Sequence, residues 1–149
     1  MVPIQQVARK SGKSTQFAAL CYRLRKNEGH EILLITSRRT GRWIMPKGWP
    51  MKGMSPDETA AQEAFEEAGV KGSIHDMSLG RYRLGRNRNR QSQRPCEAFV
   101  FPLKVRKLAR KYKEKGQRKI RWFSPETAAM LVREPKLKKI IRRFDPKLL

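Results

Sequence analysis

The stretch from Gly48 to Val70 reads GWPMKGMSPDETAAQEAFEEAGV and carries the clearest secondary-structure signal in the chain. Ser55 suits a helix N-cap, Pro56 suits the first helical position, and Glu58 completes a capping box. Gly69 supplies a stop at the C-terminal end. The sequence therefore predicts a helix that begins at Pro56 and ends just before Gly69, preceded by a loop rich in glycine, proline and methionine.

This helix has two contrasting faces when its residues are placed at about 100° intervals. Four alanines and Phe65 share one face, which we expect to pack on a sheet. Glu63, Glu66 and Glu67 lie on the opposite side, at i, i+3 and i+4. Like charges at these spacings destabilise a helix by roughly 0.2–0.5 kcal/mol per pair. A divalent cation such as Mg²⁺, which prefers oxygen ligands, would remove that repulsion. The alternative is an ordinary solvated acidic face.

The net charge is the strongest feature of the composition. Lysine and arginine together number 35 against 13 acidic residues, which gives a formal charge of +22. Such an excess favours a polyanionic partner or substrate, and the alternative is a basic surface that only maintains solubility. Charge alone does not separate RNA, DNA, nucleotides and inositol phosphates. Five of the 13 acids nevertheless lie in the segment from Asp57 to Glu67. Such a concentration of acidic residues in a basic chain indicates a specific role at that segment.

Length and composition limit the remaining classes. A chain of 149 residues fits one domain with a core of its own. No apolar run reaches the roughly 18 residues that a membrane helix requires, so we expect no membrane association. Cys21 and Cys96 lie far apart without metal-ligand spacing, and the expected compartment is the cytoplasm. The sequence does not indicate the oligomeric state.

Outside the central helix, residues 1–15 are expected to form a polar arm and residues 16–149 a single domain. A helix is expected after Ser124, ending before Pro135, and a final helix carries an apolar stripe that includes Leu137 and Ile141. Helices and strands are mixed without a regular βαβ rhythm, which indicates an α/β or α+β sandwich. The expected strands are Phe17–Leu24, Glu31–Ser37, Arg42–Met45, Ser73–Leu84, Glu97–Val105 and Arg118–Phe123.

The stretch from Gly48 to Val70 resembles the Nudix box over all 23 of its residues. That pattern is Gly, five residues, Glu, seven residues, then Arg-Glu-apolar-x-Glu-Glu-x-Gly-apolar. The spacing is matched throughout, and the part from Glu63 onward is intact. Met54 replaces the first Glu, and Gln62 replaces the Arg that helps orient the carboxylates in the family.

More weakly, the resemblance extends over most of the chain. Thr36-Ser37-Arg38, the segment from Trp43 to Gly48, and Arg118 ahead of Trp122-Phe123 look like the diphosphoinositol polyphosphate and dinucleoside polyphosphate branch. The resemblance implies a Nudix-like mixed sheet flanked by helices.

The resemblance also implies a Mg²⁺-dependent pyrophosphohydrolase, with Mn²⁺ as an alternative metal. Water would attack phosphorus and a phosphate would leave. Glu63 and Glu67 are the expected metal ligands, joined by the backbone carbonyl of Lys47. Glu66 is expected to act as the base or as a further ligand. Additional acids in the family come from outside the box, and Glu114 is the candidate here.

The two departures from the box both remove charge, which leaves a neutral Met54 and Gln62. Because Gln62 can hydrogen-bond a carboxylate but cannot supply a cation, we expect weaker metal affinity or slower turnover than is usual for the family. Arginine grips phosphate bidentately, so the basic loops are expected to hold the substrate. The expected substrate-binding residues are Ser37, Arg38, Arg86, Arg88, Arg90, Arg94 and Arg118.

Two functions therefore compete. The first is hydrolysis of a diphosphate linkage in a highly phosphorylated small molecule, either a diphosphoinositol polyphosphate or a dinucleoside polyphosphate. Oxidised nucleoside triphosphates and RNA 5′ ends rank lower. The second is a catalytically weak or inactive Nudix scaffold that binds RNA or another polyanion. The retained carboxylates favour catalysis, and the thin interleaving of aromatic and basic residues disfavours RNA binding.

Overall fold

The computed structural model describes residues 14–27, 29–85 and 96–149. Most of the predicted N-terminal arm therefore lies outside the described residues, as do Arg86, Arg88, Arg90 and Arg94. Thr15 is already the first residue of a strand. The elements are β1 (Thr15–Arg25), β2 (Gly29–Thr36), β3 (Trp43–Ile44), β4 (Lys47–Gly48), α2 (Pro56–Ala68), β5 (Val70–Ile74), β6 (Gly80–Leu84), β7 (Cys96–Leu108), β8 (Ile120–Phe123), α3 (Pro125–Leu131), α4 (Pro135–Arg143) and the 3₁₀ helix η1 (Pro146–Leu148).

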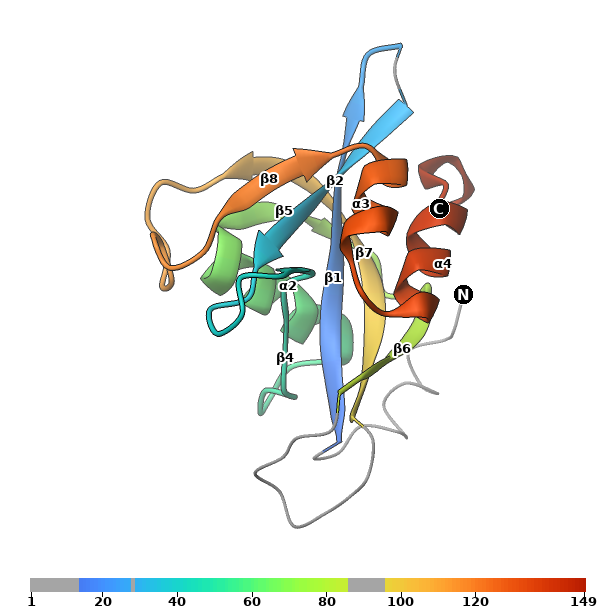
Figure 1. The fold of residues 1–149 in the computed structure, drawn as a ribbon. Coiled ribbons are helices and arrows are strands. Elements are labelled where there is room, and N and C mark those ends of the chain that lie inside the picture. The colour runs from blue at the N-terminus through green and yellow to red at the C-terminus, as the bar shows by residue number, and fades with distance from the viewer. Residues whose placement is uncertain (1–13, 28, 86–95) are drawn as a thin grey trace.

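The described strands form one mixed sheet around the parallel pair β1 and β7. β2 pairs antiparallel with β1 and carries β3 and β8, while β5 and β6 pair with β7. β4 pairs with the first half of β1. In Figure 1, α2 covers one face of the sheet, and α3 and α4 cover the other. The predicted sandwich of a mixed sheet between helices is confirmed.

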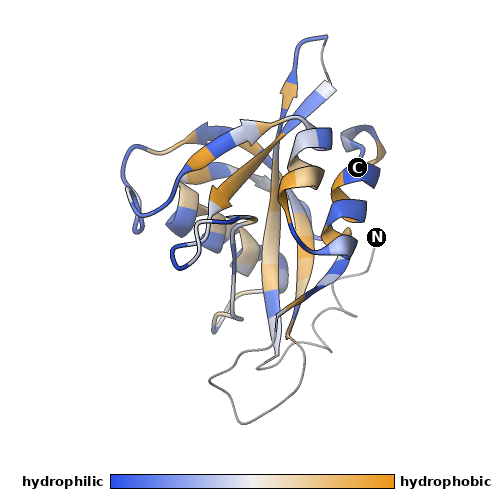
Figure 2. Cartoon of the chain, in the orientation of Figure 1, coloured by the Kyte–Doolittle hydropathy of each residue, from blue (hydrophilic) through white to orange (hydrophobic). Residues whose placement is uncertain are grey.

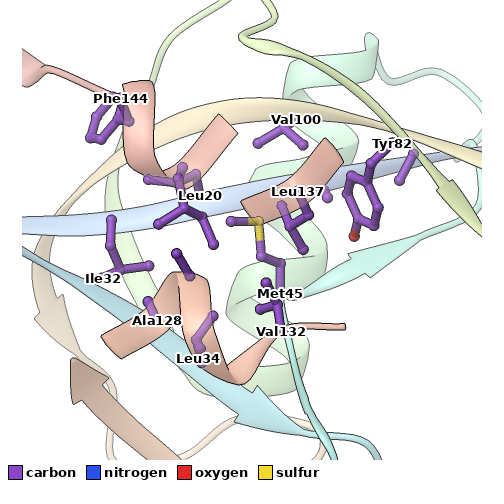
Figure 3. Close-up of a cluster of buried hydrophobic side chains, with 14 of the residues drawn as sticks. Leu20, Ile32, Leu34, Met45, Tyr82, Val100, Ala128, Val132, Leu137 and Phe144 are labelled. Atoms are coloured by element: carbon purple, nitrogen blue, oxygen red, sulfur yellow. The ribbon is translucent and has the colours of Figure 1, made fainter. Parts of the chain in front are cut away.

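The strand β1 is buried from Phe17 to Tyr22 because helices cover both of its faces. Alternate side chains enter two separate cores. Phe17, Ala19 and Cys21 pack toward α2, whereas Ala18 and Leu20 pack toward α3 and α4. Figure 2 shows the resulting apolar colouring along the central strands. In Figure 3, Ala128, Val132, Leu137 and Phe144 lie around Leu20 on the α3–α4 side.

The segment Ser73–Leu84, predicted as one strand, forms two strands with a break between Ile74 and Gly80. The reason lies in the partner strand β7, where Pro102 has no N–H to donate to a continuous ladder. Its carbonyl accepts the His75 N–H at 2.9 Å, and the Leu79 N–H bonds to Val100 at 2.8 Å. The break between β5 and β6 therefore lies opposite Pro102.

A second difference lies in the loop predicted from Lys47 onward. Lys47 and Gly48 form the short strand β4, whose register opposes Lys47 to Ala18 and Gly48 to Phe17. This pairing fixes the start of the Nudix-like stretch on the central strand of the sheet, directly below α2. The helices predicted after Ser124 and up to Phe144 are present as α3 and α4.

Candidate active site

The helix α2 is fixed at both ends by its own sequence. At the N-terminus, the Glu58 carboxylate accepts the Ser55 backbone N–H at 2.9 Å, as the predicted capping box requires. At the C-terminus, Gly69 has φ of 71° and its N–H returns to Ala64 and Phe65. Ala60, Ala64 and Ala68 are buried against the sheet, so the orientation of the acidic residues follows from the packing of the alanine face.

The acidic side of α2 does not form a solvated face. Glu67 is only 6% exposed, and Glu63 is partly buried beside it. Burial is the main cause that raises the pKa of Glu67 to about 8, and a hydrogen bond with Glu63 acts in the same direction. Burial also raises the pKa of Glu63. The two carboxyl groups therefore form a pair that retains a shared proton, carried by Glu67, in the absence of another cation.

Two groups hold Glu67 from the sheet side. The Lys47 backbone N–H donates to Glu67 Oε1 at 3.2 Å, and this contact depends on the β4 pairing. Arg118, whose side chain is only 7% exposed, lies 3.8 Å from Glu67 and donates to the Thr36 carbonyl at 3.1 Å. Arg118 also pairs with Glu114 at 2.9 Å. One guanidinium thus serves two carboxylates and leaves the Glu63–Glu67 pair without full compensation.

The segment between β7 and β8, residues 109–119, completes the site. It caps the C-terminal carbonyls of α2: the Glu114 N–H bonds to the Glu66 carbonyl at 2.9 Å, and the Ala109 N–H bonds to Gly69 at 2.7 Å. Glu114, which the sequence offered as an additional acid, is therefore brought beside the helix. Sequence reasoning missed Lys113, which lies 3.4 Å from Glu66. No local motif marks this contact, because it spans 47 positions in the chain.

Gln62 and Met54, the two residues that depart from the Nudix box, lie in different environments. Gln62 donates to Glu66 at 2.9 Å, so it hydrogen-bonds a carboxylate as expected. Met54 is 42% exposed. A carboxylate at position 54 would therefore face solvent.

An open pocket of about 240 Å³ lies next to Glu67. Three of the predicted substrate-binding residues line it: Ser37, Arg38 and Arg118. Arg38 donates to Gln117 at 2.9 Å and lies 3.6 Å from Glu114, with more than half of its side chain exposed. Lys47, which was expected to contribute its backbone carbonyl, also lines the pocket, whereas sequence reasoning missed Arg39 and Ile44. Burial lowers the pKa of Lys47, although Glu67 acts in the opposite direction.

Comparison with known proteins decides the family. The model of the NUDIX domain matches residues 14–146, which is most of the chain. The chain belongs to the Nudix hydrolase family. The 3-alpha diphosphoinositol polyphosphate phosphohydrolase of Mus musculus is 33% identical over 120 residues, covering 78% of this chain and 68% of the relative. Nudix hydrolase 12, mitochondrial, of Arabidopsis thaliana is 29% identical over 121 residues, covering 76% and 58%.

The fold matches solved Nudix structures as well. The Ap4A hydrolase of C. elegans superposes with a TM-score of 0.69 at 18% identity, covering 91% of this chain and 98% of that one. The Nudix resemblance in the sequence is confirmed, and the chain is a Nudix hydrolase whose relatives act on phosphoric anhydrides. In the part of the chain that the structure describes, no helix is long and apolar enough to cross a membrane.

Nudix hydrolases use divalent metal ions, so the question is whether the carboxylates of α2 are arranged to bind one. Among the residues described, no group of three or more His, Cys, Asp or Glu side chains is arranged to hold a metal. Glu66 accepts hydrogen bonds from Gln62 and Lys113 instead. Glu63 and Glu67 do fit a hard cation, because they are adjacent oxygen donors that now share a proton, which a cation would replace.

Gly48 lies against the side chain of Glu63, so a substitution at Gly48 tests the position of that carboxylate. A Cβ at this position would lie 2.2 Å from the Glu63 carboxyl carbon, so Gly48→Ala must displace that carboxylate. Because a flexible side chain can move aside, we expect the free energy of unfolding to change by less than about 1 kcal/mol. We expect kcat to fall at least about tenfold. At Gly85 an added Cβ meets nothing within 4 Å, so Gly85→Ala is the control. Equal activity of the two variants would contradict a role for the Glu63 position.

Proposed function

We propose that this Nudix hydrolase cleaves a diphosphate linkage in a densely phosphorylated small molecule, with Mg²⁺ or Mn²⁺ as its metal. The observation that carries the proposal is the incompletely compensated Glu63–Glu67 pair, placed at the edge of a pocket lined by basic residues. Acidic metal ligands and basic phosphate ligands are thereby combined within one site.

The substrate class follows from this charge arrangement and from the relatives. Arg38 and Arg39 are exposed at the pocket, where their guanidinium groups can bind phosphate groups beyond the one that is cleaved. For Arg38, phosphate would replace the exposed contacts with Gln117 and Glu114. Relatives act, by their names, on diphosphoinositol polyphosphates and on Ap4A. We therefore rank diphosphoinositol polyphosphates and dinucleoside polyphosphates first, ahead of oxidised nucleoside triphosphates.

In the proposed mechanism, Glu63, Glu67 and the Lys47 carbonyl would hold the metal, which would supply polarisation of the phosphate and of the attacking water. Glu66 accepts the proton of that water or supplies a further ligand. A new P–O bond forms from the water oxygen, the anhydride P–O bond breaks, and its electrons leave with the departing phosphate. Arg118 positions Glu67 and Glu114 rather than gripping substrate, since its donors are already engaged.

The direct test is phosphate release over a panel of substrates with Mg²⁺, Mn²⁺ or EDTA. The panel contains an inositol pyrophosphate, Ap4A, an oxidised nucleoside triphosphate and a 5′-triphosphorylated RNA. We expect metal-dependent turnover of the first two in preference to the others. If none is hydrolysed while RNA is bound in a salt-sensitive manner, the chain is the polyanion-binding scaffold instead.

Arg38 should act on substrate binding more than on chemistry. Because its contact with distal phosphates would exist in both ground and transition states, we expect Arg38→Gln to raise KM by about three- to tenfold, with kcat little changed. The rise should be larger for an inositol pyrophosphate than for a nucleoside triphosphate. Arg121→Gln on β8, exposed and outside the pocket, serves as the control. An equal rise in KM for every substrate would refute this role for Arg38.

The arginines at 86, 88, 90 and 94 remain proposed substrate ligands on the basis of sequence alone. To test them, Arg88 and Arg90 are neutralised together and KM is measured for the same substrates, with raised salt as a mimic of the mutation. The cytoplasm remains the proposed compartment, supported by two buried cysteines that form no disulfide with each other.

A further inference from the structure

A second concave surface lies on the α4 side of the sheet, away from the acidic residues of α2. It is a groove of about 380 Å³ between β6 and α4, closed at one end by the C-terminal residues. In Figure 1, α4 lies beside β6, with the C-terminus close by. A Cβ at Gly80 would lie 3.5 Å from Ile140, which is an ordinary contact distance, so α4 packs closely on β6 at this point. None of the residues assigned to catalysis lines this groove.

The floor and one wall of the groove are apolar. Leu79 and Ile140 lie half-buried at its base, and Leu148 and Leu149 form the wall at the C-terminal end. Leu148 is 77% exposed and Leu149 is 40% exposed. Exposed large apolar side chains around a concavity mark a binding surface more often than scattered single residues do.

The rim of the groove is strongly basic. Four cationic residues line it: Arg81, Lys136, Lys139 and Arg143. Arg81 pairs with Glu97 at 3.6 Å, and Asp145 is the acid on the rim. Lys136, Lys139 and Arg143 make no ion pair or hydrogen bond with any other residue that the structure describes. Three cations therefore stand uncompensated around an apolar floor.

We propose that this groove docks an acidic amphipathic helix of a partner protein. Such a helix presents leucine-like side chains to the floor and carboxylates to the basic rim, the usual arrangement for a helix bound in a groove. The charge of the partner complements that of the rim, which also steers association. The proposal is independent of the substrate assigned to the Nudix site.

Other polyanions fit these observations less well. Single-stranded nucleic acid needs exposed aromatic rings for stacking. The aromatic residue that lines the groove, Phe144, is only 6% exposed, and its ring packs edge-on against Tyr22 with the ring centroids 4.9 Å apart. An anionic membrane meets protruding apolar residues, whereas these line a concave surface. A free phosphate would gain nothing from the leucine wall.

The test uses the full chain and a fluorescent peptide of about 20 residues, long enough to form a helix. The peptide carries leucine at helical three-and-four spacing, with glutamate and alanine elsewhere. A second peptide has the same composition in scrambled order. We expect the patterned peptide to bind at least about tenfold more tightly in fluorescence anisotropy. Equal binding of the two peptides would overturn the proposal, because only net charge would then be recognised.

Two variants locate the binding. Lys136→Glu with Lys139→Glu should weaken binding of the patterned peptide at least about tenfold, and Leu148→Ser should weaken it as well. Arg106→Glu with Arg121→Glu removes the same positive charge at exposed positions outside the groove and should change the affinity less than about threefold. All variants should keep the wild-type unfolding midpoint.

Competing ligands complete the experiment. The rim variant, Lys136→Glu with Lys139→Glu, should lower the affinity for a single-stranded oligonucleotide and for phosphatidylserine vesicles no more than the Arg106–Arg121 variant lowers it. If instead the rim variant selectively loses oligonucleotide or vesicle binding and keeps peptide binding, the groove serves that other ligand and the peptide proposal is wrong.

Discussion

Replacing Glu67 by Gln is expected to reduce kcat by roughly 100-fold or more, the range found for groups that act directly on a transition state. The substitution keeps the shape and the hydrogen bond from the Lys47 N–H but removes one proposed metal ligand. Calorimetric titration with Mn²⁺ should show the metal affinity falling in parallel. The fold should survive, because Gln resembles the protonated Glu67 that the buried pair favours.

The matched control is Glu126→Gln, at an exposed position in the first turn of α3. It removes the same charge from the chain and should change neither kcat nor metal affinity measurably. If Glu67→Gln and Glu126→Gln bind metal and turn over substrate alike, the acidic cluster is not the catalytic centre.

The second large effect concerns pH and metal together. The folded-state pKa of Glu67, about 8, lies above its ordinary value of 4.5. The unfolded chain therefore releases this proton at a lower pH than the folded chain. Without metal, the contribution of Glu67 to the free energy of unfolding should be greatest below about pH 4.5 and should decline as pH rises toward about 8. Because Glu63 is coupled to Glu67, the decline belongs to the pair rather than to one residue.

Added Mg²⁺ should reverse this trend, since it binds the deprotonated pair and releases the shared proton. The stabilisation by Mg²⁺ should therefore grow from pH 5 to pH 8.5 in urea unfolding experiments. Glu67→Gln removes the titrating group, so its unfolding free energy in EDTA should depend less on pH and should exceed that of wild type near pH 8. A wild-type curve in EDTA parallel to that of Glu67→Gln would contradict the buried pair.

Local sequence was enough to predict α2 and much of the architecture. The Ser55 cap, Pro56 and the Gly69 stop act within a few residues of each other, so no tertiary information is needed to place the helix. The apolar run Phe17–Leu24 likewise predicted the strand that the structure shows as β1. The acidic triplet and its Nudix-like spacing identified the family, because that signature is continuous in the chain.

What the sequence could not decide depends on residues that are distant in the chain. Glu63, Glu66 and Glu67 are equivalent by spacing, but packing buries Glu67, pairs it with Glu63 and turns Glu66 toward Gln62 and Lys113. Arg118 is predicted from the sequence as a phosphate ligand, but the sequence could not reveal that its guanidinium group is buried and bonded to Thr36 and Glu114.

The sequence by itself determined the family, the central helix and the identity of the acidic residues, because each rests on short-range spacing. The tertiary structure alone decided which carboxylates interact, which cations compensate them and which basic residues stay unpaired around the groove. Burial and long-range contacts set these outcomes: the free energy of a charged group depends on its removal from water and on its partners, and neither is encoded in neighbouring positions.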